Sequence, residues 1–315
     1  VVWLVKLIET AQALPPTERA QCGRALGLLG DPRKGVDLRD GLPDIDWVPI
    51  PDDGEWIYQE DKHPPLPAFS ISRYPITYAQ FQAFVDAPEF TDDRWWKGMP
   101  DEQNAYGTNY RTRELSEQAF KYDNHPRETV SWYQAVAFCR WLTHHMRGTV
   151  VGTAFLPSAE TDDEKTDAKN GVPTSLVIGE NAIITLPTEQ QWEKAARGTD
   201  GRQYPYEGNF DSATGNTSEK GIGQTSAVSI FPDGRSPYGV LDMSGNVWQW
   251  CLNKYYEPDQ IDVNDSGDYR VLRGGSWFDD GDLARAVYRL DSRPANRSYA
   301  VGFRVVWVGV PSQSI

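Results

Sequence analysis

The sequence predicts an α+β fold in which long ordered loops take up more of the chain than regular helices and strands. The chain contains 12 tryptophans, 27 glycines and 22 prolines, and such a composition is typical of irregular loops around an aromatic core, because indoles bury large areas and glycine permits tight turns. Three short helices share one N-terminal motif, and helical periodicity disappears after Gly198. We therefore expect less regular secondary structure than an average domain contains.

Length and charge exclude several classes of partner. A chain of 315 residues can bury a large core. Its formal net charge of -14 repels phosphate backbones and anionic lipids, so we expect neither a nucleic-acid partner nor membrane insertion. No apolar stretch approaches the roughly 18 residues that span a bilayer, and Val1–Val5 is too short for a secretory signal. These features favour a cytoplasmic location, and we expect a monomer.

Residues 1–44 are expected to form an N-terminal helical segment and a linker. Thr17–Leu29 begins with a threonine N-cap and has apolar residues at helical spacing, and Gly30 is the expected stop. The segment Val1–Leu14 is expected to form a second helix. The segment Asp31–Asp44 is rich in charge, glycine and proline, which indicates a linker.

The main domain is expected over residues 45–315, and alternation in Ile45–Ile50 predicts its first strand. Three helices should follow, each starting with a hydroxyl N-cap and a glutamine three residues later, so that the two side chains satisfy each other's backbone N–H groups. These pairs are Thr77 with Gln80, Ser131 with Gln134, and Thr188 with Gln191. The second helix should cover 132–144, and the third should cover 189–197 and end at Gly198.

The rest of the main domain is expected to consist of loops and short strands. Ser158–Gly179 is polar and predicts an exposed insertion. Val271–Val306 predicts a strand, a long ordered loop and a strand. Between them, Gly245-Asn246 suits a turn with positive φ, and alternation places Trp248 and Trp250 on one face of a strand.

The three cysteines predict no disulfide framework and no metal clip. Cys22, Cys139 and Cys251 are odd in number and widely spaced. Cys139 falls on the core face of a predicted helix, and Cys251 follows the tryptophan pair. We interpret them as packed, reduced thiols.

Six ordered motifs resemble the formylglycine-generating enzyme (sulfatase-modifying factor) family, and the resemblance covers about Asp46 to Val306. It implies a variant of the C-type lectin fold. The motifs are Val130–Trp141, Leu186–Arg197, Tyr204–Asn209, Leu241–Trp250, Arg273–Trp277 and Gly302–Val305.

The catalytic residues that this resemblance implies are missing. Enzymes of the family use two cysteines after the Gly-Gly-Ser motif to bind copper and the substrate thiol, and the matching positions here hold Ala284 and Arg289. Neither side chain supplies a thiolate, which cuprous ion and thiol exchange both require. We therefore expect no enzyme activity, with a copper-dependent cysteine-oxidising enzyme as the less favoured alternative.

A second branch, the ergothioneine-pathway sulfoxide synthases, takes iron from a separate helical domain with a histidine-rich motif. The four histidines of this chain are His63, His125, His144 and His145. The adjacent pair points about 100° apart on a helix, which is not the spacing that grips one metal ion. We expect a solvated pair near a helix end.

The resemblance also implies two structural calcium sites, both with altered ligands. One matches Asp242, Gly245, Val247 and Gln249, where a neutral amide replaces a carboxylate. The other matches Asn216, Thr217, Lys220 and Ile222, where lysine takes the acidic position and Glu219 is a possible substitute. Calcium prefers anionic oxygen ligands. We therefore expect no metal or other cofactor, and only the first set as a weak calcium candidate.

A third branch comprises the variable proteins of diversity-generating retroelements, which display ligand-binding residues near the C-terminus of the lectin-like fold. Their variable codons arise by mutation of template adenines and cannot encode Lys, Glu, Gln, Met or Trp. All five residue types are absent from Phe278 to Val306. The resemblance therefore implies a variable region at about 278–300.

The composition of this region also suits a binding surface, because apolar and aromatic anchors alternate with small polar and acidic residues. Arg285, Arg289 and Arg304 are expected to hold the scaffold, and Asp279–Asp282 is equally consistent with a solvated loop. The predicted ligand-binding residues are Phe278, Asp279, Asp280, Asp282, Ala286, Tyr288, Leu290, Asp291, Ser292, Arg293, Ser298, Tyr299 and Ala300.

The leading hypothesis is a non-catalytic, receptor-like protein that binds a protein or another macromolecule through this surface. The alternative is an inactive family module that acts as a sensor or structural part of a larger signalling protein.

Overall fold

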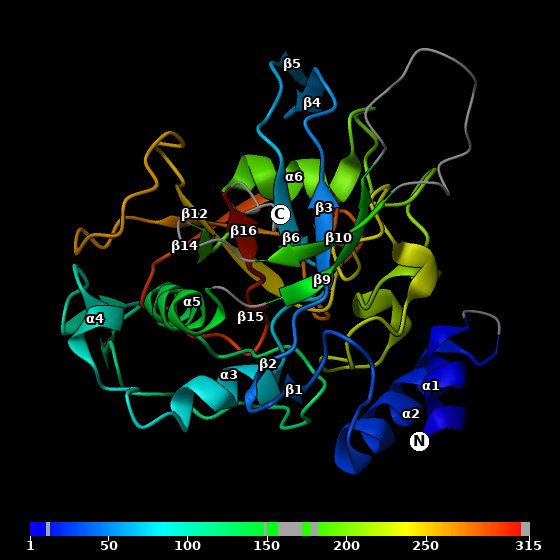
Figure 1. Ribbon diagram of the computed structural model, residues 1–315, viewed down its shortest axis with the longest axis horizontal. Helices are drawn as coiled ribbons and strands as arrows, with labels where there is room; N and C mark the ends of the chain where they lie inside the picture. The colour runs from blue at the N-terminus through cyan, green and yellow to red at the C-terminus, as the bar shows by residue number, and fades with distance from the viewer. Residues whose placement is uncertain (11–12, 148–149, 157–171, 178–181, 310–315) are drawn as a thin grey trace.

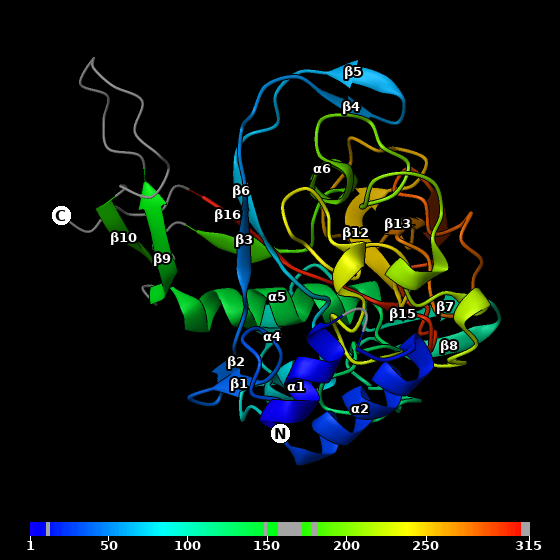
Figure 2. The ribbon, with the colours of Figure 1, turned by 90° about the vertical axis from the view of Figure 1, so that its right-hand side faces the viewer.

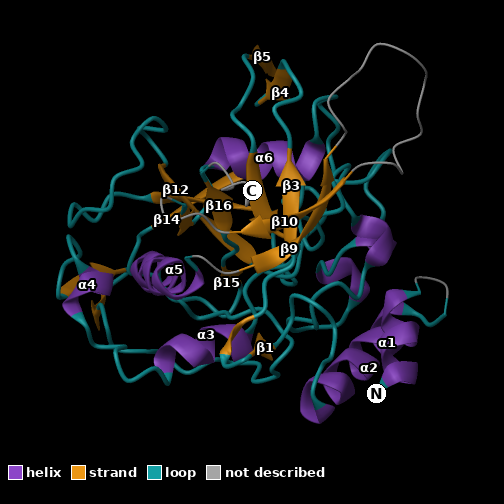
Figure 3. Ribbon diagram, in the orientation of Figure 1, coloured by secondary structure: helices purple, strands orange, loops and turns teal. Residues whose placement is uncertain are grey.

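Two four-stranded sheets form the centre of the molecule, and loops surround them (Figures 1 and 3). The first sheet has the order β11-β16-β6-β3 with antiparallel neighbours. Its strands are β3 (Trp47–Ile50), β6 (Phe69–Ser72), β11 (Ile183–Thr185) and β16 (Val306–Val308). The computed structural model describes residues 1–10, 13–147, 150–156, 172–177 and 182–309.

The second sheet has the order β14-β13-β12-β15. Its strands are β12 (Trp248–Lys254), β13 (Arg270–Arg273), β14 (Arg289–Ser292) and β15 (Val301–Gly302). The pair β12–β15 is parallel, and the other two pairs are antiparallel. The sequence predicts a strand, one long loop and a strand over Val271–Val306. This prediction is incomplete, because two further strands, β14 and β15, interrupt the expected loop.

Three helices confirm the three capping boxes. They are α3 (Tyr78–Val85), α5 (Trp132–Met146) and α6 (Glu189–Arg197). In each one, the N-cap hydroxyl accepts a hydrogen bond from the N3 backbone and the glutamine side chain accepts one from the N-cap backbone. Gly198 caps α6 with φ 69°, as expected of a glycine stop. The short helix α4 (Asp93–Trp96) lies outside this pattern.

An aromatic core packs between α5 and the second sheet. Trp248 and Trp250 both lie in this core, as their alternation on β12 predicts, and they are 4% and 0% exposed. The turn before them has positive φ at Gly245 (85°) and Asn246 (69°), as expected. Phe138 on α5 contacts Phe303 edge to face, with ring centroids 5.5 Å apart. This core fixes the position of the sheet that carries residues 278–300, called the C-terminal segment below.

The N-terminal residues form a helical pair, α1 (Val2–Glu9) and α2 (Pro16–Leu29), side by side at one edge of the molecule (Figures 1 and 2). The expected Thr17 cap is wrong, because α2 begins at Pro16 and has no side-chain cap. The first helix ends at Glu9, short of the expected Leu14. Gly30 follows α2 with φ 86° and is the stop that the sequence predicts.

The segment Asp31–Asp44, expected to be a linker, packs against the main body. Asp31 and Arg33 are buried and paired, with a shortest contact of 2.6 Å. Arg33 also donates to the backbone oxygen of Val228 at 2.9 Å. A small hairpin of β1 (Leu38–Arg39) and β2 (Leu42–Pro43) completes the segment. Part of the charge in this segment therefore serves buried pairing, while Lys34, Arg39 and Asp40 are exposed.

Three further hairpins project from the body. They are β4 (Trp56–Tyr58) with β5 (Asp61–His63), β7 (Glu102–Ala105) with β8 (Thr108–Arg111), and β9 (Val150–Leu156) with β10 (Val172–Val177). The β4–β5 hairpin arches over α6 (Figure 2). Most of the insertion expected at 158–179 lies outside the described residues, and its described part, 172–177, is β10.

Between α6 and β12 the chain forms loops and three short 3₁₀ helices (Figure 3). They cover Ser212–Thr214, Ser218–Lys220 and Pro232–Gly234. This agrees with the loss of helical periodicity after Gly198. Within the described ranges, no helix is both long and apolar enough to cross a lipid bilayer.

Candidate functional site

A cavity of about 440 Å³ opens beside the second sheet, and the C-terminal segment forms most of its wall. Strands β13 and β14 contribute two apolar side chains that face each other in register, Leu272 and Leu290. The cavity lining consists of Tyr106, Trp248, Leu272, Ser276, Phe278, Asp279, Leu290, Asp291, Ser292, Asn296, Ser298, Tyr299, Ala300 and Val301.

The cavity brings together most of the residues that the sequence predicts for ligand binding. Those that line it are Phe278, Asp279, Leu290, Asp291, Ser292, Ser298, Tyr299 and Ala300. Asp280, Asp282, Tyr288 and Arg293 lie elsewhere on the same segment, and Asp280 and Asp282 are exposed. The segment therefore contributes both a cavity wall and an exposed flank.

Ala286 does not belong to an accessible surface. It is 0% exposed and packs in the second core cluster with Trp192 and Val271. Its backbone oxygen accepts a hydrogen bond from Arg273 at 2.6 Å. A side chain in this position supports the segment from behind, so the prediction of Ala286 as a contact residue is wrong.

Six lining residues were not predicted from the sequence. Leu272 and Ser276 precede the predicted set in sequence, Asn296 lies within it, and Val301 follows it directly. Trp248 was assigned to the core alone. Tyr106 comes from the distant β7–β8 hairpin, where it has φ 53° and precedes Gly107 at φ 86°. The only sequence signal for it is a Tyr-Gly pair that suits a two-residue hairpin turn.

Aromatic rings stand at the rim of the cavity. Phe278 and Tyr106 are each 63% exposed, and Tyr299 is 46% exposed. Trp277 holds two of them in place, since its ring centroid lies 5.6 Å from those of both Phe278 and Tyr299. Exposed aromatic rings fixed by neighbours provide contact area at low entropic cost. This arrangement suits binding.

One carboxylate, that of Asp279, is held at the cavity wall by hydrogen bonds from its neighbours. Asp279 accepts a hydrogen bond from the indole N–H of Trp248 at 2.8 Å and another from the Ser276 hydroxyl. Asp291 lies on β14 opposite Val271, so strand alternation places its side chain on the same face as that of Arg289 and not with that of Leu290. Among the described residues that line the cavity, there is no lysine or arginine.

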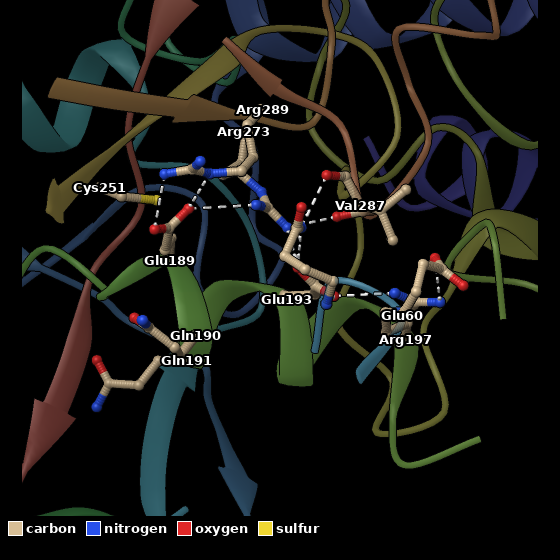
Figure 4. A network of polar contacts seen from close by, with 12 residues as sticks. Glu60, Glu189, Gln190, Gln191, Glu193, Arg197, Cys251, Arg273, Val287 and Arg289 are labelled. Atoms are coloured by element: carbon tan, nitrogen blue, oxygen red, sulfur yellow. Dashed lines mark hydrogen bonds and ion pairs between the residues drawn. The ribbon is translucent and has the colours of Figure 1, made fainter. Parts of the chain in front are cut away.

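A buried ion network fixes the back of the C-terminal segment (Figure 4). Glu189, the first residue of α6, accepts from Arg289 at 2.6 and 3.0 Å. Glu193, one turn later, pairs with Arg273 at 2.5 Å and with Arg197 at 2.9 Å. Burial raises the pKa of Glu193, but the charge of Arg273 together with hydrogen bonds from Gln59 and Arg273 outweighs burial, and the net pKa is lowered. The network therefore keeps its charges.

The β4–β5 hairpin joins this network from the other side. The side-chain amide of Gln59 donates to Glu193 at 2.6 Å and to the backbone oxygen of Val287 at 2.9 Å. The expected scaffold role of Arg289 is confirmed by its bonds to Glu189. Arg285 makes a local bond to the backbone of Asp282 at 2.9 Å. The network anchors the segment between Ala286 and Arg289.

The positions that match the family's two catalytic cysteines are built into this scaffold. Ala284 is 0% exposed, and its backbone oxygen accepts from the Ser244 hydroxyl at 3.1 Å. Arg289 is engaged with Glu189. Cys251, the thiol drawn in Figure 4, is fully buried, and burial raises its pKa, as it does for Cys139. Buried protonated thiols neither bind copper readily nor exchange with a substrate.

The first calcium candidate does not fit a metal ion well. The side-chain oxygen of Gln249 accepts from Trp192 at 2.7 Å and from Arg304 at 2.6 Å. The guanidinium of Arg304 also takes the backbone oxygen of Asp242 at 3.1 Å. The guanidinium of Arg304 therefore already binds oxygens of Gln249 and Asp242 that a calcium ion would need. These bonds agree with the expected scaffold role of Arg304. Gly245 and Val247 lie in the same turn.

The second calcium candidate lies in the loop around the second 3₁₀ helix. Asn216 and Thr217 are buried, and the side-chain oxygen of Asn216 has no partner among the described residues. Lys220 and Ile222 are partly exposed. Glu219, considered as a substitute ligand, instead accepts from the backbone of Gly281 at 2.9 Å. Burial raises the pKa of Glu219, but hydrogen bonds from the Thr217 side chain and the Gly281 backbone lower it overall, so this carboxylate joins the loop to the C-terminal segment.

The histidines do not converge. His145 contacts Glu89 at 2.7 Å, and His144 packs against Trp95 with ring centroids 5.6 Å apart. His63 lies on β5 and His125 is buried. Among the described residues, no three His, Cys, Asp or Glu side chains form a group that could hold a metal ion.

Comparison with known proteins gives one family and several relatives. The model of the sulfatase-modifying factor enzyme 1-like domain matches residues 53–308. A hercynine oxygenase from Mycolicibacterium thermoresistibile is 26% identical over 272 residues, which cover 77% of this chain and 51% of the relative. An inactive C-alpha-formylglycine-generating enzyme 2 from Mus musculus is 27% identical over 252 residues, which cover 75% of this chain and 74% of the relative. The chain thus spans about half the length of that oxygenase.

Among solved structures, Treponema denticola variable protein 1 resembles this chain with a TM-score of 0.50 and 21% identity. The match covers 82% of this chain and 94% of the variable protein. At this level of identity the likeness concerns the fold. The chain has the C-type lectin-like fold that the six motifs predict.

Proposed function

The chain belongs to the sulfatase-modifying factor enzyme 1-like domain family, and we propose that it is a non-catalytic member that binds a macromolecular partner through its C-terminal segment. The observation that carries this proposal is the pair Ala284 and Arg289. One is a buried methyl group, and the other is an ion-paired guanidinium. The family's copper chemistry needs thiolates at these two positions.

The cavity supports a binding role in place of that chemistry. Its wall comes from the segment in which five residue types are absent, as expected of a diversified region. Behind the wall, buried charges hold the backbone in place. A partner would contact Phe278, Tyr299 and their neighbours, and a small number of central contacts would dominate the affinity. We further propose that the segment varies among sibling copies of the gene, as in retroelement variable proteins.

Sequencing sibling copies of the gene tests the diversification. Substitutions should concentrate at the accessible lining positions, such as Phe278, Asp291 and Tyr299. The supporting residues Ala286 and Arg289 should stay constant, because they face the core and the ion network. Substitutions spread evenly over 278–300, or a segment that is constant in all copies, would contradict the diversification.

Panning a displayed random-peptide library against the protein tests the binding role. We expect recovered peptides to lose at least about tenfold in affinity for the double variant F278A/Y299A, since aromatic anchors at interface centres typically contribute more than 1.4 kcal/mol. Peptides that bind wild type and variant equally well would argue against this surface. D282N, an exposed change outside the cavity, is the matched control.

The enzyme alternative has its own direct test. The purified protein is incubated with cuprous ion, oxygen and a cysteine-containing peptide, and peptide aldehyde is measured by mass spectrometry. We expect no aldehyde above the level given by copper alone. Copper-dependent aldehyde formation that requires the protein would overturn the non-catalytic assignment.

A second candidate role is that of a module inside a larger protein, and an apolar patch on the helical pair favours it. Val2 and Trp3 on α1 are 72% and 69% exposed, and Leu28 and Leu29 on α2 are 75% and 63% exposed. Exposed apolar patches often mark contacts with other domains. Hydrogen exchange in α1 should be slower in the product of the full gene than in this 315-residue chain. Equal exchange would remove this candidate.

A further inference from the structure

One face of the second sheet supplies an apolar side chain to the cavity from each of its four strands. Leu272 on β13 is paired with Leu290 on β14 and with Trp250 on β12. Trp248, two residues before Trp250, is paired with Val301 on β15. Residues two apart on a strand share a face, so these side chains lie together. The four that line the cavity, which we call the apolar floor, are Trp248, Leu272, Leu290 and Val301.

The apolar floor continues into the aromatic core. Trp248, Leu272 and Val301 belong to the first core cluster, and Leu290 packs against that cluster. Leu290 is only half-buried, so it keeps apolar area that a ligand can cover. Covering such area releases water and favours binding. The cavity is therefore a place where the edge of the core reaches the surface.

The polar side chains around the apolar floor largely satisfy one another. Asp279 accepts hydrogen bonds from the indole N–H of Trp248 at 2.8 Å and from the Ser276 hydroxyl. The side-chain amide of Asn296 donates to the Ser292 hydroxyl at 2.9 Å. A single carboxylate that two neutral donors already hold does not by itself select a cation. These pairings leave apolar surface as the main feature that the cavity offers to a ligand.

Aromatic rings at the mouth of the cavity favour a ligand that carries a ring. Phe278 and Tyr299 come from the C-terminal segment, Tyr106 comes from the turn of the β7–β8 hairpin, and all three are exposed. Aromatic pairs in edge-to-face or offset contact contribute about 0.5–1.5 kcal/mol beyond the area that they bury. The volume of about 440 Å³ lies in the lower part of the range for ligand sites and suits one large side chain.

We propose that the cavity binds one uncharged aromatic side chain presented by a protein partner, with its ring against the apolar floor and among the rings at the mouth. The proposal rests on the binding function proposed above and specifies the chemistry of its anchor. Charge also favours a neutral group. An anionic side chain would find no cation in the described lining, and a cationic one would have to compete with Trp248 and Ser276 for Asp279.

The methyl groups of Leu290 report on the apolar floor, because the ring current of a bound aromatic group shifts the resonances of nearby methyl groups. N-acetyl-phenylalanine amide is titrated to its solubility limit into protein with ¹³C-methyl-labelled leucine, and the Leu290 signals are assigned with L290M. We expect a saturable shift. N-acetyl-leucine amide should bind at least about threefold more weakly, because it lacks the ring contacts. N-acetyl-arginine amide should give no saturable shift.

A variant of the hairpin turn and a matched control complete the experiment. Y106N removes one ring at the mouth and creates the Asn-Gly pair that type I′ turns prefer, so the hairpin is retained. It should weaken the phenylalanine probe at least about threefold. Y256N makes the same change at a tyrosine that is 73% exposed and lies outside the cavity, and it should leave binding unchanged. Leucine or arginine probes that bind as tightly as phenylalanine, or equal binding by Y106N and Y256N, would overturn the proposal.

The outcome is separable from that of the proposed function. If the phenylalanine probe leaves the Leu290 signals unmoved while panned peptides still depend on Phe278 and Tyr299, the surface binds partners and the aromatic anchor is wrong. If no panned peptide depends on these residues, the binding function itself fails, whatever the probe does.

Discussion

Arg273 is the residue on which the ion network behind the cavity depends. Its side chain is fully buried, pairs with Glu193 at 2.5 Å and approaches Glu189 at 3.5 Å. It also donates to the backbone oxygen of Ala286, so it ties the C-terminal segment to α6. Burial lowers the pKa of Arg273, but the charges of Glu193 and Glu189 outweigh burial and raise it overall. The guanidinium stays charged in the core.

Replacing Arg273 by methionine should destabilise the protein by about 3 kcal/mol or more, because it removes one partner of a buried ion network. Urea unfolding measures the effect. The control is K121M, which removes the exposed pair between Lys121 and Glu117, and it should leave the urea midpoint unchanged. A loss for R273M no larger than that for K121M would contradict the importance of this network.

Individual contact residues could be predicted only where composition marks them. Phe278 and Tyr299 are aromatic residues with polar neighbours in sequence, and the structure exposes both. Ala286 belongs to the same predicted set, but its side chain is fully buried and packs in the core. Asp279 is predicted either to bind a ligand or to lie in a solvated loop, and its bond to Trp248 joins residues 31 positions apart. Sequence alone does not specify which face such residues occupy.

At the scale of elements, α6 links the N-terminal capping signal to the site. Its cap, Thr188, accepts from the backbone N–H of Gln191 at 3.1 Å, and the Gln191 side chain accepts from Thr188 at 2.9 Å. The next residue is Glu189, which holds Arg289 on β14. The capping box therefore fixes the first turn of the helix that carries both carboxylates of the network.

The variant T188A should lose about 1 kcal/mol of stability, because the backbone N–H of Gln191 loses its acceptor. T188S keeps the hydroxyl and should retain most of the wild-type stability. Thermal or urea unfolding compares the three proteins. If T188S is as unstable as T188A, the effect arises from the lost methyl group and not from the cap.

Helices were more predictable than connections for a physical reason. The three capping boxes depend on residues three positions apart, so their signal is complete within the local sequence. The segment Asp31–Asp44 has the composition of a linker, but Arg33 reaches Val228 and Ser229 across nearly two hundred positions. Strands β14 and β15 likewise form only because β13 and β12 supply their partners. No local pattern encodes such pairings.

The cavity belongs to the scale of the whole molecule. Its wall joins the C-terminal segment to β12 and to the turn of the β7–β8 hairpin at Tyr106. The family motifs predicted the fold and, through it, the segment that forms most of the wall. Tyr106 could not be assigned, because nothing near it in sequence indicates that the fold brings it beside Phe278.

His125 connects distant parts of the fold and makes their assembly sensitive to pH. It is 0% exposed, its Nδ1 lies 2.9 Å from the Thr225 hydroxyl, and its backbone oxygen accepts from Tyr78 at the start of α3. Burial, with a smaller contribution from the charge of Arg24, lowers its pKa from 6.5 to about 3. The folded protein thus keeps this ring neutral under conditions in which the unfolded chain protonates it.

Between pH 6.5 and about pH 3 the unfolded state therefore binds one more proton than the folded state, so stability falls as the pH falls. The slope approaches about 1.4 kcal/mol per pH unit, or about 2 kcal/mol between pH 6.5 and pH 5. Urea unfolding at these two pH values should show that the wild type loses about 2 kcal/mol more than H125Q, whose side chain does not titrate. An equal loss in both proteins would show that His125 is protonated or exposed in the folded state, because only then does its substitution leave the proton balance of unfolding unchanged.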